Sequence, residues 1–371
     1  MKIGACLFIP WLALFPLSCS GGSGGEDGGD GGGGGDTQRV KCGASWCAAT
    51  EICVGAAVCV SLPTQTAKAC QEDHDNIFKE VEDADLTCHN RHPCPDQETC
   101  PQSLSCKNGF CGIAAPAGAG LPSKVTFRGC VDAFGLGDVT AGMKLALFRA
   151  SDDLTASPLA EVSTFQDKEH CEYQGAFEFS DVPTNTPLVL KSWDDRDSFV
   201  KVYKHNLILW ADLATQEGGN WVFDTRNRVT DPRTGKEISL EPWRAYAISQ
   251  ATYDIILMAV RVQLGETEGA IAGTLRDCQY RELSNVRCAT YPPAQVVTYF
   301  TNAENPRPDA SRNSTNLNGI YAAIGLPQGT QKLACVARNA AGEDVPLGVY
   351  QVQVLPHAIS VLSFDWYPAL P

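Results

Sequence analysis

Three aspartates in one short segment are the first candidates for chemistry. The run Ser192-Trp-Asp-Asp-Arg-Asp197 places Asp194, Asp195 and Asp197 directly after an expected strand. Carboxylate oxygens are the ligands that Ca²⁺ prefers, so this loop is a candidate calcium site. The spacing is not that of an EF-hand and Arg196 supplies local neutralisation, so the alternative is a solvated acidic loop.

The sequence offers no catalytic constellation. Its six histidines are scattered, and none of the patterns H-E-x-x-H, G-x-S-x-G or a P-loop occurs. Glu169, His170 and Cys171 are adjacent, but neighbouring residues of a strand point to opposite faces, which is poor geometry for a triad. We therefore expect no catalytic residue, no cofactor other than that candidate calcium, and no enzymatic activity.

Seventeen cysteines predict a chain that is exported to an oxidising compartment and stapled by disulfides. The clusters lack the C-x-x-C spacing of zinc sites, so we expect disulfides there, with His89 and His92 facing solvent. The mature count is odd, so one thiol is free or pairs with Cys70 or another chain. Cys130 is expected to pair with Cys171 and Cys288 with Cys335, and the full set of disulfide candidates is Cys42, Cys47, Cys53, Cys59, Cys88, Cys94, Cys100, Cys106, Cys111, Cys130, Cys171, Cys288 and Cys335.

Three tryptophans between two expected strands are the candidate ligand-binding residues. Trp210, Trp221 and Trp243 lie in the segment 203–252, and aromatic side chains on loops of a rigid scaffold are a common design for stacking on a sugar. The alternative is that these rings cover a core of their own segment. Asp231 to Gly235 reads as a turn.

The N-terminus reads as an export signal. A charged Lys2 precedes a nearly continuous apolar run to Leu17, which is too short for a membrane span. Leu17, Ser18, Cys19, Ser20 and Gly21 resemble the lipobox of bacterial lipoproteins, although Pro16 stands where that family usually has Leu. The resemblance implies lipidation of Cys19 and, from Ser20, an outer-membrane destination. The alternative is an ordinary secretory signal that is cut nearby.

Composition excludes some partners. The net charge of −14 argues against nucleic acid, whose phosphates would be repelled. Contact with a membrane is therefore expected through the lipid anchor alone. Residues 19–41 are rich in glycine and acids, which predicts a disordered tether.

A repeat organises the rest of the chain. Gly129 and Gly273, Gly175 and Gly319, and Pro183 and Pro327 are each 144 residues apart. Apolar residues alternate around these landmarks, which predicts strands packed on a partner sheet. We expect a signal peptide at 1–18, a tether at 19–41, disulfide modules at 42–113, and β-sandwiches at 124–264 and 268–371. The segment 203–252 is an insertion in the first sandwich.

Two local predictions complete the outline. Asp73 to Asp85 reads as a short solvated helix, because it carries many acids. Tyr253 to Leu264 reads as a strand that leads into the second sandwich, after a helix over Trp243–Thr252.

The pattern of strands, G-x-F/Y-x-F and V/L-P turns resembles the carboxypeptidase regulatory-like (prealbumin-like) β-sandwich family. The resemblance covers roughly 124–200 with 252–262, and 269–365. It implies a mainly β fold of two tandem Greek-key sandwiches and carries no fixed catalytic residues. The whole layout resembles myxobacterial-type lipoproteins of predatory or gliding Gram-negative bacteria.

The sequence therefore predicts a non-catalytic lipoprotein of the outer membrane, facing the cell surface or the periplasm. A cysteine-rich stalk would display binding or adhesive modules for an unknown protein or carbohydrate, with 203–252 as the ligand face. The alternatives are an accessory or degenerate subunit of an exported hydrolase, and a purely mechanical spacer.

Overall fold

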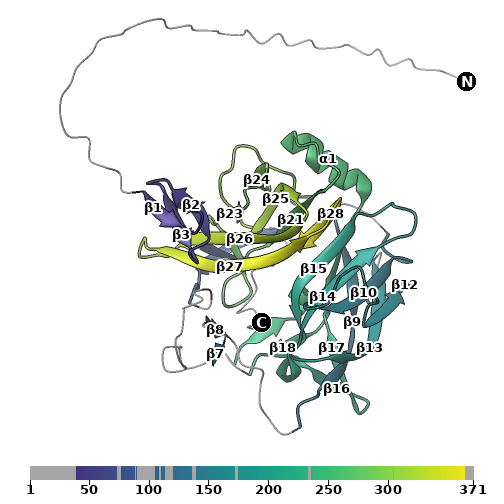
Figure 1. Ribbon diagram of the computed structural model, residues 1–371. Helices are drawn as coiled ribbons and strands as arrows, with labels where there is room; N and C mark the ends of the chain where they lie inside the picture. Colours follow the sequence, from purple (N-terminus) through teal and green to yellow (C-terminus); the bar gives the residue numbers. More distant parts are fainter. Residues whose placement is uncertain are drawn as a thin grey trace, which may run out of the picture. The chain divides into compact units, whose positions relative to one another are not determined.

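The computed structural model describes residues 39–72, 77–87, 89, 105–107, 110–112, 120–135, 139–171, 174–232, 235–303 and 305–363 (Figure 1). The predicted signal peptide, Cys19 and nearly all of the tether lie outside these residues, as do Cys88, Cys94 and Cys100. For Cys106 and Cys111 only the backbone is described. The described chain is mainly β, which confirms the predicted fold class.

The first set of strands forms two layers. β10, β14 and β15 pair in one sheet, and β12, β13, β9 and β17 pair in the other. Alternation explains the packing, because Phe177 and Phe179 are buried whereas Glu178 between them is exposed. The strands are β9 (Lys124–Phe134), β10 (Lys144–Arg149), β11 (Ala160–Ser163), β12 (Phe165–Gln166), β13 (Gly175–Pro183), β14 (Pro187–Trp193), β15 (Lys201–Ile208), β16 (Thr215–Glu217) and β17 (Asn220–Asp224).

The second set repeats this order. β23, β26 and β27 pair in one layer, and β24, β25, β21 and β28 pair in the other. The register repeats as well, because Gly129 pairs with Phe177 and Gly273 pairs with Tyr321, both at the offset seen in the sequence. The strands are β21 (Glu268–Thr274), β22 (Glu282–Ser284), β23 (Arg287–Tyr291), β24 (Val296–Tyr299), β25 (Ile320–Pro327), β26 (Gly329–Arg338), β27 (Asp344–Val354) and β28 (Ala358–Val361).

One continuous sheet joins the two sets. β15 pairs in parallel with β28, which pairs in parallel with β21, so eight strands run in the order β11-β10-β14-β15-β28-β21-β25-β24. The two sets therefore share a hydrogen-bonded sheet instead of being linked only by a connecting segment. The finer expectation of prealbumin-like Greek-key sandwiches stays a prediction.

The segment predicted as an insertion also belongs to this framework. β17 pairs with β9 in parallel through Phe223 and Phe127. β20 (Ala245–Ile248) also pairs with β9 in parallel, further along that strand. The other elements here are η2 (Ala211–Leu213), β18 (Arg228–Thr230), β19 (Glu237–Ser239) and η3 (Glu241–Trp243).

Residues 253–260 form a helix and not the predicted strand. α1 (Gln250–Val260) begins after Ser249, whose Oγ accepts a hydrogen bond from the Thr252 amide at 3.3 Å. Tyr253 and Ile256 are buried at helical spacing. They pack on β15, β21, β25 and β28 in an apolar cluster that includes Val202 and Ile359. No helix within the described ranges is long and apolar enough to cross a membrane.

The described part of the cysteine-rich segment up to residue 87 packs on the second set of strands and does not project from it as a stalk. Val54, Val58 and Val60 are buried against Ala334 and Val336 of β26. β22 pairs with β5, and β5 with β6, so the segment predicted as a short helix contains a strand. Its strands are β1 (Val40–Cys42), β2 (Ser45–Cys47), β3 (Glu51–Val54), β4 (Val58–Ser61), β5 (Lys68–Glu72), β6 (Phe78–Asp83), β7 (Ser105–Lys107) and β8 (Phe110–Gly112).

Candidate functional site: a polar cavity

A cavity of about 860 Å³ lies where three parts of the chain meet. Its walls come from described residues within 71–87 of the cysteine-rich segment, within 228–244 of the predicted insertion, and within 274–320 of the second set of strands. We call it the polar cavity. Its volume is in the range of small-molecule binding sites.

Hydrogen-bonded pairings hold these walls in place. β18 and β19 form a hairpin in which Arg228 pairs with Ser239, and the predicted turn is present as the Gly235 amide donates to the Asp231 carbonyl at 2.8 Å. On the opposite side Glu282 of β22 pairs with Cys70 of β5. The Cys278 amide donates to the Asp85 carbonyl at 3.0 Å. The cavity is therefore framed by backbone contacts between distant segments.

Ion pairs neutralise most of the charge around the polar cavity. The Arg276–Glu282 and Arg281–Asp277 pairs have N–O distances of 3.3 Å and 2.6 Å. Across from them, Arg228 pairs with Glu237 at 2.5 Å. Because the cations are matched by adjacent carboxylates, the lining offers many hydrogen-bonding groups without a strong field of one sign.

Arg244 occupies a special place among these cations. It contacts Asp132 at 3.1 Å and also pairs with Glu241. Burial alone would lower the pKa of the guanidinium, but Asp132, Tyr246 and Glu241 raise it above its ordinary value. Burial raises the pKa of Asp132, and Arg244 opposes that effect. The pair anchors the cavity wall to β9.

Burial also affects the acid on the other wall. It raises the pKa of Glu282, while the charge of Arg276 lowers it. A carboxyl with a raised pKa is a hallmark of functional sites, but it also occurs in structural ion pairs. Here the partner is 3.3 Å away, which makes a structural pair the simpler explanation.

Trp210 and Trp243 do not belong to a sugar-stacking face, and the prediction is corrected for these two residues in favour of its alternative, burial in a core. They are only 3% and 6% exposed and belong to the core of the first set of strands. Trp221 is half-buried against the same core. The Trp243 ring lies 5.4 Å from the ring of Tyr280, which lines the polar cavity. Trp243 therefore packs from the core against a residue of the cavity wall.

The aspartate loop does not form a calcium site. Asp194 is buried and accepts a hydrogen bond from the Phe199 amide at 3.1 Å, whereas Asp195 pairs with Lys144 at 2.7 Å. In the described parts of the chain, Asp194, Asp195 and Asp197 do not bring three ligand atoms within 4.8 Å of one another. Asp194 and Asp195 contact different neighbours and Asp197 is exposed, so the three carboxylates do not converge and the predicted site is corrected.

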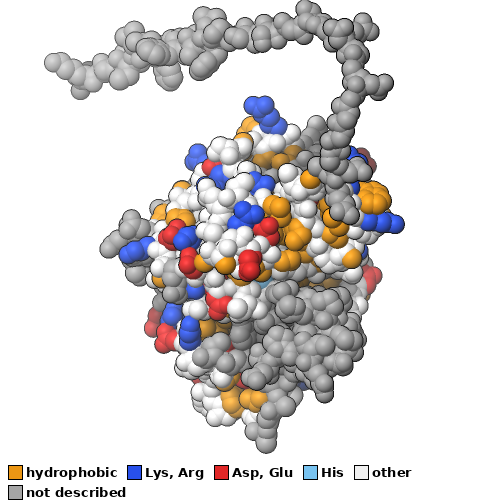
Figure 2. All heavy atoms as spheres, turned by 90° about the vertical axis from the view of Figure 1, so that its left-hand side faces the viewer, with side chains coloured by type: hydrophobic (Ala, Val, Ile, Leu, Met, Phe, Trp, Pro, Cys, Tyr) orange, Lys and Arg blue, Asp and Glu red, His pale blue; other side chains and the backbone are white. Residues whose placement is uncertain are grey.

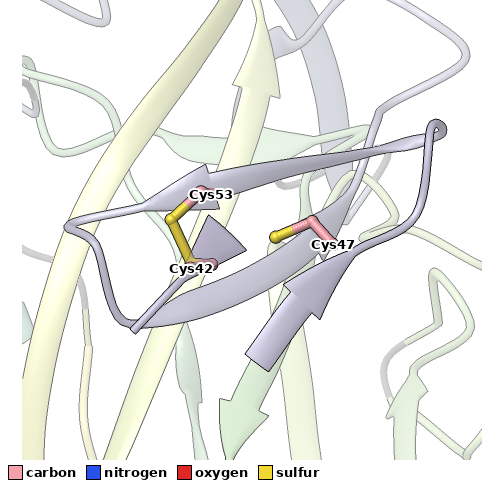
Figure 3. A group of neighbouring side chains, drawn as sticks. All are labelled: Cys42, Cys47 and Cys53. Atoms are coloured by element: carbon pink, nitrogen blue, oxygen red, sulfur yellow. A yellow bond between two sulfur atoms is a disulfide. The ribbon is translucent and has the colours of Figure 1, made fainter. Parts of the chain in front are cut away.

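Cysteines do gather at the N-terminal hairpins, but as disulfides. Figure 3 shows Cys42 bonded to Cys53, with Cys47 beside them. Cys47 is bonded to Cys59. These sulfurs lie close enough to hold a metal, but sulfur in a disulfide is not the thiolate that a metal needs. The arrangement staples β1–β2 onto β3–β4.

The remaining cysteines follow the predicted pairing in part. Cys130 is bonded to Cys171 and Cys288 to Cys335, as the sequence predicts. Cys278 is also disulfide-bonded, and Cys70 is free and buried. Burial raises the pKa of the Cys70 thiol to about 11, which keeps it protonated.

His89 is buried, which corrects the expectation that it faces solvent. Its Nε2 lies 2.5 Å from the Arg276 carbonyl oxygen. It therefore ties the cysteine-rich segment to the wall of the polar cavity. His92 lies outside the described residues.

Sequence reasoning missed the residues that line the polar cavity. Arg276, Arg281 and Glu282 were not singled out, because they match no motif and meet 228–244 only in three dimensions. One signal was available, since Asp277 and Arg281 of opposite charge flank Cys278 in a segment without apolar periodicity.

Comparisons with known proteins identify no family. No family model and no curated protein matches the chain. Among solved structures, a leucine-rich repeat protein from Bacteroides thetaiotaomicron is 9% identical over 66% of this chain, with a TM-score of 0.19, and the match spans 27% of that protein. The shaft pilin SpaA from Lactobacillus rhamnosus GG is 10% identical over 67% of this chain and 100% of its own, with a TM-score of 0.17. Likenesses this weak carry no argument about function.

Proposed function

We propose that this chain is an exported, non-catalytic binding protein of the bacterial cell envelope, held to the outer membrane by lipid on Cys19. Its disulfides support export, because such bonds persist in oxidising compartments and are rare in the cytosol. The resemblance of residues 17–21 to a lipobox supports the anchor. Both arguments concern location, and the ligand requires a separate one.

The polar cavity is the observation that carries the binding function. It is built by three segments and its charges are paired, so it suits a neutral ligand with many hydroxyl groups better than a strongly charged one. We therefore propose a carbohydrate as the ligand. The 203–252 segment then contributes through residues 228–244 and not through its tryptophans.

The cavity also bears on the two alternatives. A mechanical spacer needs no cavity, so its presence favours binding. A degenerate hydrolase would keep carboxylates that converge on a substrate. Glu237 and Glu282 instead pair with arginines, which favours a binding protein over a relative of a hydrolase.

The anchor is tested by fractionating cells that carry Cys19→Ala. We expect the wild-type chain to stay with the outer membrane and the variant to be released into soluble fractions. Cys6→Ala is the matched control, because Cys6 lies inside the apolar run, away from the lipobox. Retention of Cys19→Ala in the membrane would contradict the anchor. Protease treatment of intact cells that carry the wild-type chain distinguishes display on the surface from a location in the periplasm.

The cavity is tested with the full-length protein on a carbohydrate array. Gln279→Trp fills the cavity from a side chain that lines it, and we expect the bound signal to fall at least tenfold. Gln351→Trp makes the same substitution at an exposed position of β27 and should bind as the wild type. Equal binding by both variants, or none by the wild type, would contradict the proposal.

A further inference from the structure

A second cavity lies between α1 and the eight-stranded sheet, apart from the polar cavity. Its volume is about 120 Å³, and its walls are almost wholly apolar. We call it the apolar cavity. Figure 1 shows α1 and the strands β21, β25 and β28 on which its cluster packs.

The sequence explains why this space is unfilled. The sheet contributes small residues to the floor, namely Ala270, Ala272, Gly273 and Ala322. Opposite them, Tyr253 and Ile256 of α1 span the gap only partly. A larger residue does not fit at Gly273, because an added Cβ would lie 2.1 Å from the Leu362 carbonyl oxygen.

Two hydroxyl groups in the wall lack hydrogen-bond partners. Tyr253 is 4% exposed and Ser363 is 5% exposed, and both residues line the apolar cavity. Within the described residues, neither the Tyr253 hydroxyl nor the Ser363 Oγ has a partner. Leaving a buried hydroxyl unsatisfied is unfavourable, so such groups commonly serve a ligand or water. Two of them at one small cavity point to a polar group on its occupant.

We propose that the apolar cavity binds a small, mainly apolar molecule with one hydroxyl or carbonyl group, such as a simple phenol. The size fits, because an engineered apolar cavity of about 150 Å³ in another protein binds benzene. The ring would occupy the space above the alanines, and its single oxygen would exchange hydrogen bonds with Tyr253 and Ser363. Burial raises the pKa of Tyr253, so its hydroxyl stays neutral and available as a donor.

The apolar cavity is partly open to the surface, so entry of a small molecule requires at most a local opening of α1. The helix covers the cavity with one face, whereas its other face is in solvent, with Ile255 and Met258 exposed by 55% and 71%. Local openings of a surface element are less costly than global unfolding. The inference stands apart from the proposed carbohydrate site, because the two cavities share only Thr274 and Ile320 among their lining residues.

The test measures binding of p-cresol and toluene to the full-length protein by calorimetry. We expect one saturable site for each ligand, with p-cresol the tighter. Tyr253→Phe keeps the ring and removes the hydroxyl, so it should weaken p-cresol about fivefold, the effect of one hydrogen bond. It should leave toluene unchanged. Equal weakening of both ligands would overturn the role of the hydroxyl.

A second variant tests the location. Ala272→Leu places a larger side chain in the apolar cavity and should abolish binding of both ligands. Ala251→Leu is the matched control on the exposed face of α1 and should bind as the wild type. Carbohydrate binding reports separately on the polar cavity and on folding of the variant. Binding of p-cresol that survives Ala272→Leu, or is absent from the wild type, would overturn the proposal.

Discussion

His205 shows how burial sets the chemistry of a single side chain in this protein. It lies on β15, and its Nε2 is buried without a hydrogen-bond partner among the described residues. Burial lowers the pKa of the imidazole to about 4, although a hydrogen bond with the Gln353 backbone acts in the opposite direction. The folded protein therefore keeps His205 neutral where an unfolded chain would protonate it.

The first prediction is a loss of stability on acidification. Above the unfolded pKa of about 6.5, His205 is neutral in both states and has no effect. As the pH falls from there towards 4, the unfolded state takes up a proton that the folded state does not, so the free energy of unfolding decreases. His205→Gln should lack this component when urea unfolding is measured between pH 7 and pH 4.

Two half-buried acids also make stability depend on pH, so the effect of His205 is measured as the difference between the wild type and the variant. Burial raises the pKa of Asp132 and of Glu282, so each adds stability as the pH falls, opposite in sign to His205. Subtracting the pH profile of His205→Gln from that of the wild type removes their contribution. Parallel profiles for the two proteins would show that His205 titrates normally.

Single residues also show what sequence reasoning can reach. The Cys288–Cys335 bond was predictable, because both cysteines lie within expected strands, and the structure shows that these strands are neighbours. For Trp210 and Trp243 the sequence left a surface site and a core as alternatives, since an aromatic residue in a segment of unknown packing suits both, and the structure shows the core. Contacts between distant segments decide whether such a side chain is buried, and these contacts cannot be read from the sequence.

α1 shows the same limit at the level of an element. The run Tyr253 to Leu264 is apolar enough for a strand, and a short apolar run does not distinguish helix from strand by periodicity alone. The Ser249 cap and burial at positions 253 and 256 accompany the helix. The β-strands around the 144-residue repeat were predictable because their alternation spans several residues on each side of a turn.

Two adjacent isoleucines provide the prediction for α1. Ile256 is 7% exposed beneath the helix and Ile255 is 55% exposed on its outer face. Ile256→Ala should lower the free energy of unfolding by about 2–5 kcal/mol, whereas Ile255→Ala should change it by less than about 0.5 kcal/mol. Urea unfolding of the two variants measures both values.

The pair also tests the helix itself. In a strand, Tyr253 and Ile255 would share one face and Ile256 would lie on the other. With Tyr253 buried, the costs of the two alanine substitutions would then be reversed. A larger loss for Ile255→Ala would therefore contradict the helix and restore the strand.

At the scale of the whole molecule, β28 is the strand that connects the two sets of strands. Residues 38–371 form one compact unit, and β28 pairs on one side with β15 of the first set and on the other with β21 of the second. Figure 2 shows acidic and basic side chains interspersed over the coloured part of the visible face, so this face is not split into an acidic and a basic region. The shared sheet thus couples two cores that the sequence treats as separate copies.

The final prediction is that damage to β28 weakens both sets of strands together. Ser360 is fully buried and faces Tyr203 on one side and Ile271 on the other. Ser360→Pro removes a ladder hydrogen bond from the middle of the sheet and should cost about 3 kcal/mol or more. Hydrogen exchange should then accelerate in peptides from β15 and from β21.

Two variants serve as controls. Ser360→Ala controls for the lost hydroxyl, which donates to the Gln353 carbonyl. Ser163→Pro places proline on the edge strand β11, where it is better tolerated. Faster exchange in only one of the two strands after Ser360→Pro would mean that the two sets fold independently.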